Sequence, residues 1–205
     1  DYDVTILPPK SFLQPPKETV LTFKTGVGYE SVIDAEPFVL FGVHPYDMVA
    51  MAQMDEIFSQ ENRDGHYMTR RENATVVVVD VQKVSPDVFA GYMGTSHVEE
   101  GYDVLLTKIG DVYIVDAKTE KGEALMAGLA DAPDASESWL EQRRLVWDYN
   151  KQRLRKHELI AEPSKWPEPL EDAYDHPMSE ERAKLCFSCG SCNLECPECH
   201  CFDVW

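Results

Sequence analysis

Basic residues and long hydrophobic runs are both scarce in this chain of 205 residues. Lys and Arg number 19 against 37 Asp and Glu, which gives a formal net charge of −18 at pH 7. Such a surface repels phosphates, so we expect no nucleic-acid partner and no docking on an anionic membrane. The longest apolar run, residues 74–79, is far shorter than the roughly 20 residues that a membrane helix needs, so we also expect no membrane insertion.

Cysteine is absent before position 186, and several catalytic motifs are missing altogether. The chain is long enough to bury a hydrophobic core without disulfides. We find no secretory signal and no cysteines elsewhere that could pair with the clustered ones, so disulfides are an unfavourable explanation for them. The HExxH, GxSxG and P-loop patterns do not occur, so nothing in the sequence indicates hydrolysis or phosphoryl transfer.

Predicted strands and helices alternate along most of the chain. This alternation predicts an α/β fold with a mixed sheet, with α+β as the alternative. The valine run in 75–79 indicates a strand that is buried on both faces. The last long helix is the most basic stretch, and its basic residues form either a solvated face or a docking face for an acidic partner. Strands are predicted at 19–23, 38–43 and 75–79 and in a hairpin of 102–108 with 112–115, and helices at 45–59, 120–129 and 136–159.

The composition divides the chain into three parts. Residues 1–160 form the α/β unit, which we interpret as a scaffold or docking domain, and prolines near its start predict an extended arm. Residues 161–178 are rich in proline and acidic residues and are predicted to be a linker. Residues 179–205 form a ferredoxin-like segment, which opens with a short helix at 179–185 that Ser179 is expected to cap.

All six cysteines lie within sixteen residues, and the first four follow the spacing CxxCxxCxxxCP. This run is typical of bacterial ferredoxins that bind a [4Fe–4S] cluster. Thiolates two residues apart on a curling loop can point at three corners of the cluster, and Gly190 lets the backbone approach the inorganic sulfides. In two-cluster ferredoxins the cysteine before the proline serves the other cluster. The predicted ligands are Cys186, Cys189, Cys192 and Cys196.

The two remaining cysteines and the kind of metal leave alternatives open. Cys199 and Cys201 exceed what one cluster needs, so they either help to bind a second cluster or are spare thiols. His200, which lies between them, is expected to face solvent or to form a hydrogen bond rather than to ligate a metal. A zinc ion in a structural or assembly module is the main alternative, although zinc sites more often place two CxxC pairs a dozen or more residues apart.

Two other segments could carry a site of their own. His44–Asp47 falls where a predicted strand passes into a helix, a place where α/β folds often bind ligands, although a plain helix start is the simpler interpretation. Residues 91–97 are rich in small residues and form either a structural turn or a loop that approaches a cofactor or partner. A ligand crevice built from both segments would make the chain an enzyme in its own right. Gly26 and Gly28 lack the rest of a nucleotide-binding fingerprint and are interpreted as a loop.

Several segments, taken in order, resemble the iron–sulfur (beta) subunit of cytoplasmic sulfhydrogenases, a family of dicluster type shared with the A subunit of anaerobic sulfite reductase. The C-terminal stretch with its CPxCxCFDV ending is specific, and the earlier segments are persuasive through their order. The segments are LPPK at 7–10, FGVHPYD at 41–47, YMGT at 92–95, GYDVLLT at 101–107, and residues 186–204.

The resemblance implies an electron-transfer subunit of an anaerobic, cytoplasmic oxidoreductase complex. Such subunits relay electrons between a flavoprotein subunit that handles NAD(P)H and a catalytic metal subunit, a hydrogenase or a reductase, and do no bond chemistry themselves. The implied cofactor is a [4Fe–4S] cluster, one or two of them, held by the cysteines of 186–201.

This chain also departs from the family pattern. Family chains extend on both sides of it, and the second CxxCxxCxxxCP motif that follows in them is missing here. The sequence is therefore a fragment, or else a partner or Cys199 and Cys201 complete the ligand set. Many relatives have a cysteine where this chain has Tyr46, and further cysteines where it has residues 87–91. If those cysteines hold an extra centre in the relatives, this chain lacks it.

Overall fold

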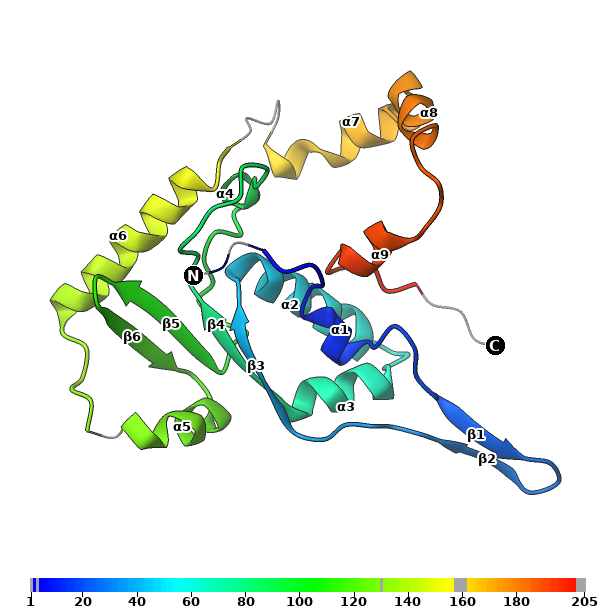
Figure 1. The fold of residues 1–205 in the computed structure, drawn as a ribbon, viewed down its shortest axis with the longest axis horizontal. Coiled ribbons are helices and arrows are strands. Elements are labelled where there is room, and N and C mark those ends of the chain that lie inside the picture. The colour runs from blue at the N-terminus through cyan, green and yellow to red at the C-terminus, as the bar shows by residue number, and fades with distance from the viewer. Residues whose placement is uncertain (1, 3, 130, 157–161, 202–205) are drawn as a thin grey trace.

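Figure 1 shows the computed structural model, which describes residue 2 and residues 4–129, 131–156 and 162–201. Within these residues the body of the protein is built on a four-stranded sheet with the order β3-β4-β5-β6. The first three strands run parallel, and β6 pairs antiparallel with β5. This mixed sheet with its helices confirms the predicted α/β fold class. The strands are β3 (Phe38–Val43), β4 (Ala74–Val79), β5 (Val104–Ile109) and β6 (Val112–Ala117).

The central strand β4 is covered on both faces, as its valine run predicts. Val76 and Val78 lie in the main core together with methionines of α2 (Pro45–Ser59), and Val77, on the opposite face, is fully buried as well. Parallel neighbours need a crossover connection, and α2 with α3 (Gly65–Asn73) supplies it between β3 and β4. Figure 1 places α2 and α3 on one side of the sheet and α5 (Glu120–Met126) and α6 (Glu137–Arg153) on the other.

Local chemistry explains where the helices begin. Pro45 is the first residue of α2, where its missing N–H costs no helical hydrogen bond. The Asp64 carboxylate accepts hydrogen bonds from the backbone N–H groups of His66 and Tyr67 at 2.9 and 3.0 Å and so caps α3. Thr119 caps α5 in the same way through Gly122. The helices predicted at 45–59 and 120–129 are confirmed, the second with a 3-10 turn (Ala127–Leu129) as its last part.

The third predicted helix is shorter than expected, and its basic residues have another use. α6 ends at Arg153, and residues 157–159 of the prediction lie outside the described residues. Arg153 donates hydrogen bonds to the carbonyls of Val81 and Gln82, and Arg143 pairs with Asp116 at 3.0 Å. These two arginines bind α6 to its own domain. For these two arginines neither predicted alternative applies, whereas Arg144 and Lys151 of the same helix are exposed, as a solvated or docking face requires.

The N-terminal region holds elements that the sequence did not predict. The arm expected to be extended contains the short helix α1 (Lys10–Leu13), whose Leu13 is fully buried in the core. β1 (Leu21–Lys24), shifted slightly from the predicted 19–23, pairs with β2 (Gly28–Ser31) in a separate hairpin that projects from the body (Figure 1). The Gly26–Gly28 loop forms the turn of this hairpin.

The C-terminal region is more helical than its prolines suggested. Residues 161–178 contain a 3-10 turn (Pro163–Lys165) and α7 (Pro167–Asp172), because proline suits the first position of a helix. The next helix, α8 (Pro177–Ala183), begins before the predicted 179, and His176, not Ser179, caps it. Figure 1 shows the chain passing along α7 and α8 and then returning, through α9 (Ser191–Glu195), toward α1. Of the helices in the described part of the chain, none has both the length and the apolar character that crossing a bilayer demands.

Candidate metal centre

The six cysteines lie on a curled segment that runs from the end of α8 past α9, and all six thiols are free. Cys192 lies in the first turn of α9, and Cys196 is its C-terminal cap. Between Cys186 and Cys192 the backbone turns through two left-handed residues, Ser188 at φ +60° and Gly190 at φ +76°. A Cβ at Gly190 would have open space around it, so glycine is needed there for its backbone conformation. The predicted curling loop is therefore present.

The first half of this segment is exposed, and a neighbouring serine changes the pKa of one of its thiols. Cys189 Sγ lies 3.2 Å from Ser191 Oγ. Hydrogen bonds from the Ser191 side chain and backbone lower the pKa of the Cys189 thiol. The thiolate is the form of cysteine that binds metals, so this contact favours the form of Cys189 that a metal would need.

In the second half, the thiols of two cysteines contact Asn193. The thiols of Cys192 and Cys199 both donate to Asn193 Oδ1, at 3.8 and 3.9 Å. Burial by itself raises the pKa of the Cys196 thiol, but hydrogen bonds from the Glu198 and Cys199 backbone and from the Cys199 thiol hold it below its ordinary value. The same contact with Cys196, with some burial, raises the pKa of the Cys199 thiol. The Cys196 and Cys199 thiols therefore influence each other directly.

The cysteine segment docks on the α/β domain through the N-terminal arm. Lys10 Nζ donates to the carbonyl oxygens of Asn193 and Cys199 at 2.7 and 2.6 Å, and Gln14 Nε2 donates to that of His200 at 3.2 Å. The His200 ring packs edge-on against Phe58 of α2, with centroids 5.7 Å apart, and its Nδ1 lies 2.9 Å from the carbonyl oxygen of Glu198. His200 thus has a packing and hydrogen-bonding role, as the sequence suggested.

The donor set fits an iron–sulfur cluster. Six free thiols are soft ligands, and the lowered pKa of Cys189 and of Cys196 favours the thiolate form that iron needs. Within the described residues, no three Cys, His, Asp or Glu side chains already gather closely enough to hold a single metal ion. Thiolates suit zinc as well as iron, so the preference for the cluster comes from the CxxCxxCxxxCP spacing.

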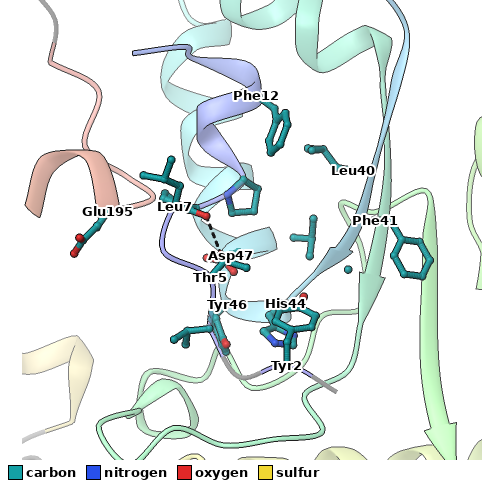
Figure 2. A pocket seen from close by; sticks show the side chains of 15 residues that line it. Tyr2, Thr5, Leu7, Phe12, Leu40, Phe41, His44, Tyr46, Asp47 and Glu195 are labelled. Carbon is teal, nitrogen blue, oxygen red and sulfur yellow. Dashed lines mark hydrogen bonds between the residues drawn. The ribbon is translucent and has the colours of Figure 1, made fainter. Parts of the chain in front are cut away.

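A cavity of about 390 Å³ lies where β3 passes into α2, next to the cysteine segment. Figure 2 shows His44, Tyr46 and Asp47 on one side of it, Tyr2 of the N-terminal arm over His44, and Glu195 of α9 across from them. Gly42 bulges the end of β3 at φ +91°, where a Cβ would meet the Tyr2 hydroxyl at 3.2 Å. The segment at 44–47 is the start of α2, as the simpler interpretation predicted, and its side chains also line this cavity.

Two acidic groups in this cavity are shifted by burial. Burial raises the pKa of Asp47 to about 6. Burial, with a smaller contribution from the Asp47 charge, raises the pKa of Tyr2 to about 12. His44 stacks on Tyr2 with ring centroids 4.4 Å apart, and its Nδ1 lies 3.2 Å from the Val79 carbonyl oxygen. The N-terminal arm therefore stacks its own Tyr2 on His44, beside the Asp47 carboxyl group with its raised pKa.

Residues 91–97 do not join this cavity; instead they pack against α6. Gly91 lies in α4 (Ala90–Met93), and a Cβ there would lie 2.3 Å from the backbone oxygen of Lys151. Gly94, at φ +78°, ends α4, and the His97 ring stacks on Trp147 at 4.9 Å. The interpretation of residues 91–97 as a structural turn is therefore correct. Residues 44–47 and 91–97 do not form the shared ligand crevice that was considered as an alternative.

Sequence reasoning missed Lys10, Gln14 and Asn193, which hold the cysteine segment in place. They lie 183 to 189 residues from their partners or inside the segment itself, so no local pattern connects them. One signal was available, since Lys10 is the last residue of the LPPK segment that contributes to the family resemblance.

No protein-family model matches the chain, and no solved structure matches it. Sulfhydrogenase 2 subunit beta of Pyrococcus furiosus is 28% identical over 208 residues, an alignment that covers all of this chain and 60% of that relative. This chain therefore spans 60% of the length of the relative that it matches. The resemblance to the sulfhydrogenase beta subunit, predicted from five ordered segments, is confirmed along the whole of this chain.

Proposed function

We propose that the chain is the iron–sulfur subunit of a hydrogenase-type oxidoreductase complex, in which it relays single electrons. The observation that carries the proposal is the segment 186–201, where the ferredoxin spacing occurs with every thiol free. The similarity to a sulfhydrogenase beta subunit over the whole chain supports it. The 1–160, 161–178 and 179–205 division also stays part of the proposal, with the α/β domain as the scaffold for the cysteine segment.

Each part of the segment has a role under this proposal. Cys186, Cys189 and Cys192 hold three corners of a [4Fe–4S] cluster, and Cys196 holds the fourth or ligates a second cluster. Such a cluster, when bound, takes up and releases one electron at a time. Ser191 favours the thiolate of Cys189. Cys199 and Cys201 contribute to a second cluster or remain as thiols beside the first.

The exposure of this segment suits a role in electron transfer between subunits. Cys186, Cys189 and Cys192 are exposed, and so are the apolar side chains of Leu185 and Phe187 next to them. A partner subunit that covered these side chains would come close to the cluster. The family resemblance suggests which partners these are. One would be a flavoprotein that handles NAD(P)H, the other a catalytic metal subunit, and the complex would work in an anaerobic cytoplasm.

Metal analysis tests the proposal directly. Iron, acid-labile sulfide and zinc are measured per chain after anaerobic purification, together with EPR spectra of the reduced protein. We expect about four irons and four sulfides for one [4Fe–4S] cluster, or about eight of each for two. Zinc without sulfide would show an assembly module instead and would overturn the electron-transfer role.

A pair of cysteine variants adds a control. Cys189→Ser should lose or convert the cluster, whereas Cys201→Ser should keep the EPR signal of the first cluster. Full iron content and unchanged electron transfer in Cys189→Ser would contradict the ligand assignment. Loss of the signal in Cys201→Ser but not in Cys189→Ser would assign the cluster to the second half of the segment.

A further inference from the structure

Lys10 is a buried cation that lies under the cysteine segment. Only 7% of its surface is exposed, although lysine is almost never buried without a partner. Among the described residues its partners are two backbone carbonyl oxygens, that of Asn193 at 2.7 Å and that of Cys199 at 2.6 Å, and no carboxylate pairs with it. The positive charge is therefore not neutralised by an ion pair with either partner.

The two carbonyls bracket the part of the segment that contains Cys196. The Asn193 carbonyl belongs to the last turn of α9, and that of Cys199 follows the Cys196–Pro197 turn. By binding both, Lys10 fixes the ends of the loop on which Cys196 and Cys199 face each other. The Cys196 and Cys199 thiols of this loop lie near enough to Lys10 to be affected by its charge.

The position of Lys10 is fixed by the core. Leu13, in the same short helix, is fully buried in the main hydrophobic cluster. Arg70 of α3 donates to the Leu13 carbonyl at 3.3 Å and forms an ion pair with Glu18, just beyond α1. The Lys10 charge is thus held by the α/β domain in a constant place relative to the cysteine segment.

We propose that Lys10 is a positioning residue that also raises the reduction potential of the cluster held by the cysteine segment. Reduction adds one negative charge to the cluster, and a fixed, buried positive charge nearby stabilises the reduced form more than the oxidised form. Net charge and hydrogen bonding around the thiolates are among the factors that set such potentials. This inference rests on the proposed function, since it requires a cluster on these cysteines.

The test is an EPR-monitored redox titration of the whole chain, purified anaerobically, with iron and sulfide measured in every sample. Lys10→Met and Lys10→Gln remove the charge, and Lys10→Arg keeps it. Lys24→Gln removes the same charge from the exposed hairpin strand β1 and is the matched control. We expect both neutral variants to hold the cluster with a midpoint lower by about 59 mV, which corresponds to a tenfold shift in a one-electron equilibrium. Lys10→Arg should shift by less than half of that, and Lys24→Gln should not shift.

The other possible results also test the inference. Neutral variants with full clusters and the parent midpoint would overturn the inference while leaving the proposed function intact. If the neutral variants bind no cluster but Lys10→Arg does, at the parent midpoint, the need for a cation at this place is supported. Failure of all three variants to bind a cluster would show a purely structural lysine and would overturn the electrostatic role. An unaltered protein without iron and sulfide would instead refute the proposed function itself.

Discussion

Trp147 Nε1 donates a 2.9 Å hydrogen bond to Asp80 Oδ2 and so joins α6 to the end of β4. Thr107 donates to the same oxygen, while Asp80 Oδ1 has no hydrogen-bond partner among the described residues. Burial raises the pKa of Asp80, and the hydrogen bonds from Thr107 and Trp147 work against that effect. The carboxylate therefore depends on a small number of donors, one of which is carried by α6.

Trp147→Phe should destabilise the protein, because it removes this donor and keeps a ring to pack on His97. We expect the free energy of unfolding to fall by about 1–3 kcal/mol at pH 7. Without the Trp147 hydrogen bond the Asp80 carboxylate is less stable, so its pKa in the folded variant rises further. The folded variant then binds a proton at a higher pH than the folded parent, so the loss of stability should be smaller at pH 4–5 than at pH 7. Urea denaturation at both pH values measures it.

Trp139→Phe is the matched control for this change, because Trp139 lies near the start of α6 and is 37% exposed. It should cost little at either pH. Equal costs for the two variants would mean that the bond to Asp80 contributes nothing beyond the burial of the ring.

Gly91→Ala should loosen the contact between α4 and α6. The added Cβ would lie 2.3 Å from the Lys151 carbonyl oxygen, which belongs to helix backbone and has little freedom to move. We expect a loss of about 1–3 kcal/mol in the free energy of unfolding, with faster hydrogen exchange in the last turns of α6. Gly128→Ala, where a Cβ meets nothing within 4 Å, should be close to neutral. A Gly91→Ala protein as stable as this control would show that the two helices can separate at no cost.

Ser191→Ala should raise the pKa of the Cys189 thiol, because the serine side chain is the largest cause of its lowering. In metal-free, reduced protein, Cys189 should then react more slowly with iodoacetamide at neutral pH, since the thiolate is the nucleophile. Mass spectrometry of the labelled peptide across pH 6 to 9 follows the change. Cys186, in the same peptide region, serves as an internal control and should keep its rate; an unchanged Cys189 profile would count against the role of Ser191.

The sequence predicted those parts of the fold that local patterns determine. β3 and α2 are found at the predicted 38–43 and 45–59, because a buried apolar run and a proline at the first helical position are strong local signals. α3 was missed because its sequence, GHYMTRREN, shows no apolar periodicity. Of its nine residues only Tyr67 and Arg70 are buried, and the arginine is stabilised there by Glu18, 52 residues earlier.

The same contrast holds for the candidate site. The candidate thiol ligands follow from spacing alone, since CxxCxxCxxxCP occupies twelve consecutive residues, 186–197. The residues that seat them on the domain were not, because a lysine is expected to be exposed and the contact of Lys10 with Cys199 spans 189 residues. For the cavity, the sequence indicated a possible site at 44–47 but not its other walls, because Tyr2 and Glu195 line it only when the N-terminal arm, β3 and α9 meet.

Asp47→Asn should stabilise the protein at neutral pH and remove part of its pH dependence. The Asp47 pKa is raised by burial to about 6 from an ordinary value of 3.8. Between about pH 4 and pH 6 the folded state thus binds more protons than the unfolded state, so the parent loses stability as pH rises through this window. A pKa shift of two units corresponds to a loss of at most about 2.7 kcal/mol in the free energy of unfolding. The Asp47 side chain is partly exposed, and its negative charge is favourable in the first turn of α2, so we expect Asp47→Asn to gain about 1–2 kcal/mol at pH 7.

Urea denaturation of the parent and Asp47→Asn at pH 4, 5, 6 and 7 measures this effect. The two proteins should be about equally stable at pH 4, where the carboxyl group is protonated and resembles the amide, and should diverge as pH rises to 7. Asp111→Asn, at the exposed turn between β5 and β6, controls for the loss of one negative charge from an acidic protein and should follow the parent curve. If both variants gain the same stability at pH 7, the gain comes from the change in net charge. Burial of the Asp47 carboxylate would then not destabilise the folded protein.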